Sequence, residues 1–213
     1  KAIGAAMEGN ATMDKIVLPR SMDKIVLPKF IWEQHSVTWQ LTDKHLTDND
    51  MLVVALLLPN MTGLSTLTLA SNQLSEKGVD YLSEAMSNIK LLKTLDMANN
   101  VLRDEGAKGI AKLIGTENSS CTSINLSKSE IGDEGAMAIG AALQGNETLK
   151  NLNMLGNTFG EKGATALMPY YEIMRQTIET SLGWKGVNSE EWDLSKKKLT
   201  DGDMLLIEPL LRT

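Results

Sequence analysis

The sequence contains a single cysteine, Cys121, and only two histidines, His35 and His45. One cysteine cannot form an internal disulfide, and a structural zinc site usually takes four cysteine or histidine ligands. The sequence therefore predicts no disulfide framework and no metal site. So little cysteine is also typical of a protein that works in a reducing, intracellular compartment.

The chain also lacks the features of nucleic-acid-binding and membrane proteins. Its formal net charge is −6, and aromatic residues make up only 4% of it. A mildly acidic protein does not attract nucleic acids or anionic lipids. The longest apolar run, residues 51–58, is far shorter than the roughly 20 residues that a membrane-spanning helix needs. We therefore expect no nucleic-acid binding and no membrane insertion.

Leucine and asparagine, by contrast, are abundant, with 31 and 14 residues, and both recur at a regular spacing. Each unit has apolar residues in the pattern L-x-x-L-x-L, then an asparagine or serine, an apolar residue and a glycine. An earlier stretch with Trp39, Leu41 and Leu46 fits the same frame, which makes five consecutive units and indicates a repeat architecture. The asparagine position holds Asn72, Asn100, Ser129 and Asn157, at steps of 28, 29 and 28 residues.

Each unit predicts a short strand followed by a helix. The apolar residues of the first part alternate, as in a strand with one buried face. The asparagine that follows can hydrogen-bond backbone groups where the chain leaves the strand. Each helix is expected to begin at an acidic residue that caps free N–H groups or interacts favourably with the helix dipole. These residues are Asp48, Glu76, Asp104, Asp133 and Glu161.

This pattern resembles the leucine-rich repeat, specifically the ribonuclease-inhibitor-like family with 28-residue repeats and a full helix in each unit. The resemblance covers roughly residues 36–174. It implies an α/β solenoid with a parallel sheet on the concave face and helices on the convex face. The family includes inhibitors, innate-immune sensors, actin-capping proteins, Ran GTPase-activating proteins and cytoskeletal or ciliary components, so the resemblance is specific for fold rather than for function.

The two ends of the chain repeat parts of its middle. Residues 1–12 are similar to residues 137–148, and residues 192–211 are similar to residues 39–58. We therefore expect a fragment of a longer protein in which blocks of repeats recur. The short duplication within residues 13–29 is compatible with a local duplication, with missing residues or with an error in the sequence. The predicted divisions are the end of a preceding block (1–18), a junction (19–35), a five-unit block (36–174), a connector (175–191) and the start of a following block (192–213).

Motifs that could indicate chemistry are better explained by the repeat. Neither G-x-x-x-x-G-K-[ST] nor G-x-G-x-x-G occurs, so the usual nucleotide-binding loops are absent. The acidic segments 47–50 and 200–203 lack the spacing of a calcium loop and fall at predicted helix starts. The two histidines lie near serine and aspartate, but the open face of a solenoid rarely forms the pocket that a triad needs. We predict no catalytic, cofactor-binding or metal-binding residue.

Other proteins are the expected partners, and two kinds of surface could bind them. On the concave face, the variable strand positions are small and polar and lack the aromatic and arginine residues that dominate binding hot spots. These positions include Gln40, Thr68, Asp96, Asn125 and Asn153. The helix within residues 51–59 is apolar on nearly every side, unlike an ordinary solenoid helix; it packs either beneath the preceding connector or against a partner. The apolar candidates are Trp32, Leu52, Val53, Leu56, Leu57, Tyr170, Tyr171 and Trp184.

The sequence thus predicts a non-catalytic scaffold of a large intracellular assembly, with a cytoplasmic location and a cytoskeletal or ciliary setting suggested by the resemblance. One alternative is a protein that activates a small GTPase, although the chain has few arginines and no acidic tail. A second is the ligand-sensing arm of an innate-immune receptor. A GTP-hydrolysis assay separates the first alternative from the scaffold.

Overall fold

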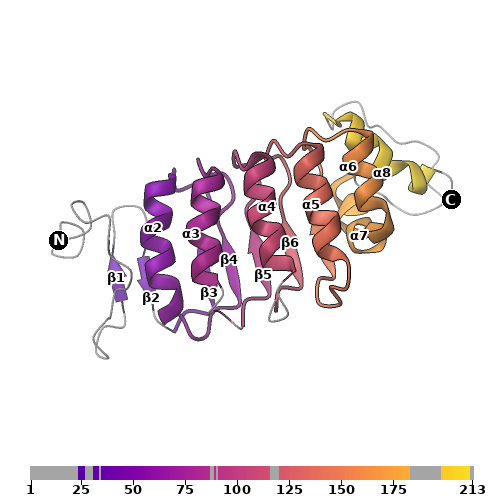
Figure 1. The fold of residues 1–213 in the computed structure, drawn as a ribbon. Coiled ribbons are helices and arrows are strands. Elements are labelled where there is room, and N and C mark those ends of the chain that lie inside the picture. The colour runs from indigo at the N-terminus through magenta and orange to yellow at the C-terminus, as the bar shows by residue number, and fades with distance from the viewer. Residues whose placement is uncertain are drawn as a thin grey trace.

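The computed structural model of the protein describes residues 24–26, 31–33, 35–86, 89, 91–115, 120–182 and 198–211. Strands and helices alternate along the chain and form two layers, with a parallel sheet on one side and a row of helices on the other (Figure 1). The predicted α/β solenoid is therefore confirmed. We call the solvent-facing side of the sheet, opposite the helices, the sheet face.

The strands are three residues long and pair in register, each with the strand of the next unit. In spatial order they are β3 (Thr38–Gln40), β4 (Thr66–Thr68), β5 (Thr94–Asp96), β6 (Ser123–Asn125) and β7 (Asn151–Asn153). The helices of the other layer are α2 (Asp48–Leu57), α3 (Glu76–Met86), α4 (Arg103–Ile114), α5 (Asp133–Leu143), α6 (Glu161–Leu167) and α8 (Asp201–Leu211). Short 3-10 helices, η1 (Leu58–Asn60) and η2 (Met168–Tyr170), follow α2 and α6.

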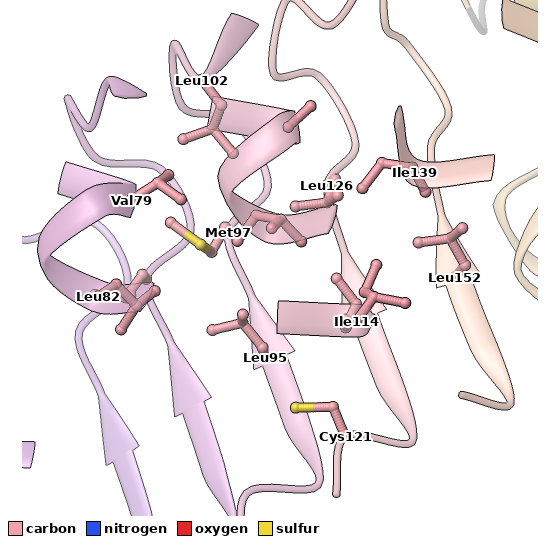
Figure 2. Close-up of a cluster of buried hydrophobic side chains, with 14 of the residues drawn as sticks. Val79, Leu82, Leu95, Met97, Leu102, Ile114, Cys121, Leu126, Ile139 and Leu152 are labelled. Atoms are coloured by element: carbon pink, nitrogen blue, oxygen red, sulfur yellow. The ribbon is translucent and has the colours of Figure 1, made fainter. Parts of the chain in front are cut away.

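The core lies between the two layers and follows the apolar columns of the repeat (Figure 2). The central residue of each strand points into it, and Leu67, Leu95 and Leu152 are at most 1% exposed. Residues at helical spacing, such as Val79 and Leu82 of α3, close the core from the other side. Cys121 is buried among them, and its burial raises the pKa of its thiol to about 11.

The asparagine column joins each unit to the one before it. Asn157 is fully buried, and its Nδ2 donates to the carbonyl oxygens of Met154 in its own unit and Leu126 in the preceding unit, at 2.7 and 2.9 Å. Its Oδ1 accepts hydrogen bonds from the N–H groups of Ser129 and Ile131. Asn72 and Asn100 also donate to carbonyl groups of their own and the preceding unit. The side chains therefore satisfy backbone groups that leave the sheet in two consecutive units.

The acidic residues at the helix starts act only partly as we expected. The three aspartates Asp48, Asp104 and Asp133 lie in the first turn of their own helices, where an acidic side chain interacts favourably with the helix dipole. The alternative that they cap their own helices is wrong, because their carboxylates accept hydrogen bonds from the first turn of the next helix. Asp104 Oδ1 accepts from the N–H groups of Gly132 and Gly135, at 2.7 and 2.9 Å. A Cβ on Gly135 would lie only 2.8 Å from this oxygen, which explains the glycine column. The same arrangement joins Asp48 to Ser75 and Gly78, and Asp133 to Gly160 and Gly163.

This cap between units gives a direct test. We expect Asp104→Ala to lower the free energy of unfolding by about 1–2 kcal/mol, because two N–H groups of α5 lose their acceptor. Glu76→Ala is the matched control, since Glu76 holds the same column and makes no such bond to α4 in the described part of the chain; its effect should stay within about 0.5 kcal/mol. Equilibrium unfolding in urea measures both, and equal losses would contradict the cap.

The C-terminal end departs from the repeat. Helix α7 (Tyr171–Leu182) packs against β7, at the edge of the sheet, whereas α8 packs against α6 and extends the helix layer. Asp203 of α8 is fully buried and accepts a hydrogen bond from the N–H of Gly156, at 2.9 Å. In the earlier units the equivalent N–H, such as that of Lys128, donates to a carbonyl of the next unit. The carboxylate of Asp203 therefore accepts the hydrogen bond that, in the earlier units, a backbone carbonyl of the next unit accepts.

The predicted divisions of the chain are only partly visible. The boundary expected after residue 174 falls inside α7, so this helix belongs to both the predicted block and the predicted connector. Within the expected junction 19–35, β1 (Lys24–Val26) pairs with β2 (Ile31–Glu33) in antiparallel orientation. Residues 1–18 and 183–197 lie outside the described residues, and their division into blocks stays a prediction.

Candidate functional site

The structure brings the predicted polar residues of the sheet face together in one column. The register of the parallel strands places Thr68 beside Asp96, and Asn125 beside Asn153. Gln40 begins the column and pairs with Thr68. Neighbouring strands of a sheet lie about 4.8 Å apart, so these five side chains form a regular row across the sheet. A second row runs parallel to it and contains Thr38, Thr66, Thr94, Ser123 and Asn151.

Three members of the first row are held by their own backbone. The Oδ1 atoms of Asp96, Asn125 and Asn153 each accept a hydrogen bond from the N–H two residues further on, at 3.1, 3.2 and 3.1 Å. Such turns fix the orientation of a short polar side chain. Within the described part of the chain, the Nδ2 groups of Asn125 and Asn153 donate no hydrogen bond. The row therefore presents oriented donors that the protein itself does not use.

Two further features make this row polar without aromatic anchors. The hydroxyl oxygen of Thr68 is buried and has no hydrogen-bond partner within the described structure. Asp96 is the one acidic member of the row, and it lies between Thr68 and Asn125. The single aromatic residue of the five parallel strands, Trp39, points the other way and is only 4% exposed. Hydrogen bonding rather than apolar contact is thus what the sheet face can offer.

The predicted apolar surface on α2 is much smaller than expected. Leu57 is 1% exposed, so it lies in the core and cannot contact a partner in this structure. Leu52, Val53 and Leu56 are half-buried. The apolar character of this helix has a structural reason, because α2 packs against the sheet, against α3 and against the turn that follows it. The three half-buried residues stay predicted partner contacts.

The aromatic candidates contribute differently. Tyr170 and Tyr171 are half-buried and pack against the core where η2 meets α7. The hydroxyl of Tyr171 is buried without a hydrogen-bond partner in the described chain, and burial raises its pKa. Trp32 lies in β2, which pairs with β1 in a separate two-stranded sheet and not in the sheet that carries the row. The structure describes only its backbone. Trp184 lies outside the described residues.

A shallow hollow on the helix layer was not predicted. It has a volume of about 570 Å³ and lies between α5 and α6, lined by Met137, Glu161, Lys162, Thr165 and Ala166. Met137 is 48% exposed, although the same position of α4 and α6 holds Lys108 and Thr165. A methionine at the position where α3, α4 and α6 have polar residues was the one signal in the sequence.

Residues with the potential for other chemistry do not form a cluster in the described ranges. No group of three or more histidine, cysteine, aspartate or glutamate side chains comes close enough there to hold a metal ion. His35 and His45 are both exposed. None of the described helices has the length and apolar character needed to cross a membrane.

Comparison with known proteins agrees with this geometry. The family model described as "Leucine Rich repeat" matches residues 89–111, 117–140 and 145–168, which are three consecutive segments. A comparison with curated proteins gave no match. The chain therefore contains leucine-rich repeats, a module of protein–protein interaction, in the region that carries α4, α5, α6 and the strands between them.

Proposed function

We propose that this protein is a non-catalytic scaffold that binds other proteins through the sheet face. The observation that carries the proposal is the row of oriented polar side chains on that face. The backbone of the row is held by the parallel strand ladders, and Asp96, Asn125 and Asn153 are also held by turns. A partner therefore does not have to order these groups, which lowers the entropic cost of binding.

The absence of aromatic and arginine residues from the row favours many moderate contacts over one strong contact. A protein that binds in this way gains affinity when several surfaces engage the same assembly. This reasoning supports a place in a multi-protein assembly such as a cytoskeletal or ciliary one. We further propose, from the repeat pattern of the sequence, that the repeats are of the ribonuclease-inhibitor-like subtype and that the chain is a fragment of a larger intracellular protein.

Site-specific photo-cross-linking tests the use of the sheet face. A photoreactive residue in place of Asn125 should form adducts with partner proteins in extract of the native source, and the same residue in place of Lys112 should not. Lys112 is a suitable control because it is exposed on α4, in the helix layer. Asn153→Ala should weaken the adducts formed at position 125. Equal adducts from both positions would contradict the proposal.

Activation of a small GTPase remains the alternative that this experiment also tests. Activating proteins that supply an arginine need a guanidinium group that is free to reach the nucleotide. Arg103 is paired with Glu130 at 3.3 Å, and Arg175 is paired with Glu172 and Glu179 at 3.1 and 2.9 Å. Surface ion pairs of this kind are weak, so the scaffold proposal depends on the polar row of the sheet face and not on these pairs. If the cross-linked partner is a small GTPase and the protein accelerates its GTP hydrolysis, GTPase activation replaces the scaffold as the proposed function.

A further inference from the structure

The hollow on the helix layer lies between α5 and α6, which are neighbours in that layer (Figure 1). Its volume is about 570 Å³, and Met137 of α5 lines it together with Thr165 and Ala166 of α6. Met137 is 48% exposed. Single exposed apolar side chains are common, but one that borders a hollow can be buried by a protein that fills the hollow.

The outward face of α5 lacks the charges that the preceding helices carry. The difference is clear at two outward positions, four residues apart, which hold Asp80 and Glu84 in α3, Lys108 and Lys112 in α4, and Met137 and Ala141 in α5. After Glu134, α5 contains no charged residue at all. Because taking charged groups out of water costs free energy, a protein can cover α5 at a lower cost than α3 or α4.

Two opposite charges flank the apolar part of the hollow. Glu161 and Lys162 are consecutive residues of α6, both line the hollow, and both are exposed. Neither side chain forms an ion pair within the described residues. By contrast, Lys108 on the far side of α5 is paired with Glu105 and Glu134, at 2.7 and 2.9 Å. In the part of the chain that the structure describes, the hollow thus offers one acidic and one basic group that the protein does not pair itself.

These two charges indicate which occupant fits the hollow. In a two-fold symmetric dimer, residue i contacts residue j of the other copy, and residue j contacts residue i, so the surface must be complementary to itself. A surface with one acidic and one basic residue beside an apolar centre meets this condition. A two-fold axis at the hollow brings Glu161 of each copy next to Lys162 of the other. A partner surface of one charge sign would instead place a like charge against one of the two residues.

We propose that the hollow between α5 and α6 is the contact surface of a two-fold symmetric dimer of this protein. Met137 of each copy enters the hollow of the other, and two ion pairs between Glu161 and Lys162 form at its rim. The contact lies on the side of the molecule opposite the sheet face, so a dimer presents two sheet faces (Figure 1). The sheet-face function proposed above does not depend on this contact.

Sedimentation equilibrium of the whole chain tests the dimer. We expect a dissociation constant of about 10–100 μM, because a contact limited to two helices is at the small end of protein interfaces. Met137→Lys gives α5 the residue that α4 has at this position and should raise the dissociation constant by at least about tenfold. Leu91→Lys is the matched control, since Leu91 is 52% exposed but precedes β5 and lies outside the helix layer; it should leave the dissociation constant unchanged.

Two outcomes of this experiment would overturn the proposal. One is a monomer that persists at a concentration of about 1 mM. The other is a dimer that Met137→Lys weakens no more than Leu91→Lys does, because association would then use another surface. Circular dichroism establishes that each variant keeps the fold of the original chain.

Charge reversal tests the two-fold pairing. Glu161→Lys and Lys162→Glu, each alone, place like charges opposite one another and should raise the dissociation constant by about threefold to tenfold. Both substitutions in one chain restore opposite charges, so the dissociation constant should return to within about twofold of the original value. An equimolar mixture of the two single variants should also associate more strongly than either variant alone. If neither the double variant nor the mixture regains association, the two-fold pairing is wrong.

Discussion

Asn157→Ala is expected to lower the free energy of unfolding by about 3–4 kcal/mol, one of the two largest losses we predict for a single substitution in this chain. The amide of Asn157 makes four hydrogen bonds to backbone groups, two of them to carbonyls and two to N–H groups. All four lie in buried surroundings, and alanine leaves them without a partner or with strained alternatives. Urea unfolding followed by circular dichroism measures the loss.

The chain contains a matched control in the same column. Ser129 is as buried as Asn157, but its hydroxyl makes only long contacts, at 3.3 and 3.5 Å. Ser129→Ala should therefore cost less than about 1 kcal/mol. A similar loss in both variants would mean that burial alone, and not the bridging of two units, decides the effect.

Gly140→Ala is the second large effect. A Cβ at this position would lie 2.5 Å from the carbonyl oxygen of Ala166, which belongs to the backbone of α6. Backbone cannot rotate away as a side chain can, so α5 and α6 must separate. We expect a loss of about 2–3 kcal/mol, even though alanine favours a helix over glycine by about 1 kcal/mol.

Gly115→Ala separates the steric term from helix propensity. Gly115 ends α4 with a φ of −76°, and a Cβ there would meet nothing closer than the carbonyl oxygen of Ala111, at 3.4 Å. This variant should be neutral or more stable by less than about 1 kcal/mol. The thermal unfolding midpoint should therefore fall for Gly140→Ala and stay the same or rise for Gly115→Ala. A fall of the same size in both would contradict the close approach of α5 and α6.

The repeat could be predicted from the sequence because its determinants are local and periodic. The leucine columns give one buried residue in each strand, such as Leu95, and one buried face on each helix. Once the period is known, the residues of the sheet face follow from alternation, so the row from Gln40 to Asn153 was predicted as a set. Parallel register then places its members side by side.

Features that depend on the distance between units could not be predicted in this way. Asp104 caps the next helix because of how far α5 lies from α4, and no pattern within one unit contains that distance. Leu57 was predicted to contact a partner because its helix has no polar face, whereas the turn after α2 buries it. Helix α7 occupies the edge beside β7, where the repeat alone predicts another strand.

The aspartate caps also have a mechanical consequence. They fasten α2 to α3, α4 to α5 and α5 to α6, but Glu76 provides no such fastening between α3 and α4 in the described structure. Under tension applied along its length, the array should behave as two stiff segments joined by a softer joint. We expect that, in an optical trap, α3 and α4 separate first and the rest of the array unfolds at higher force. The extension of the protein should therefore increase in steps.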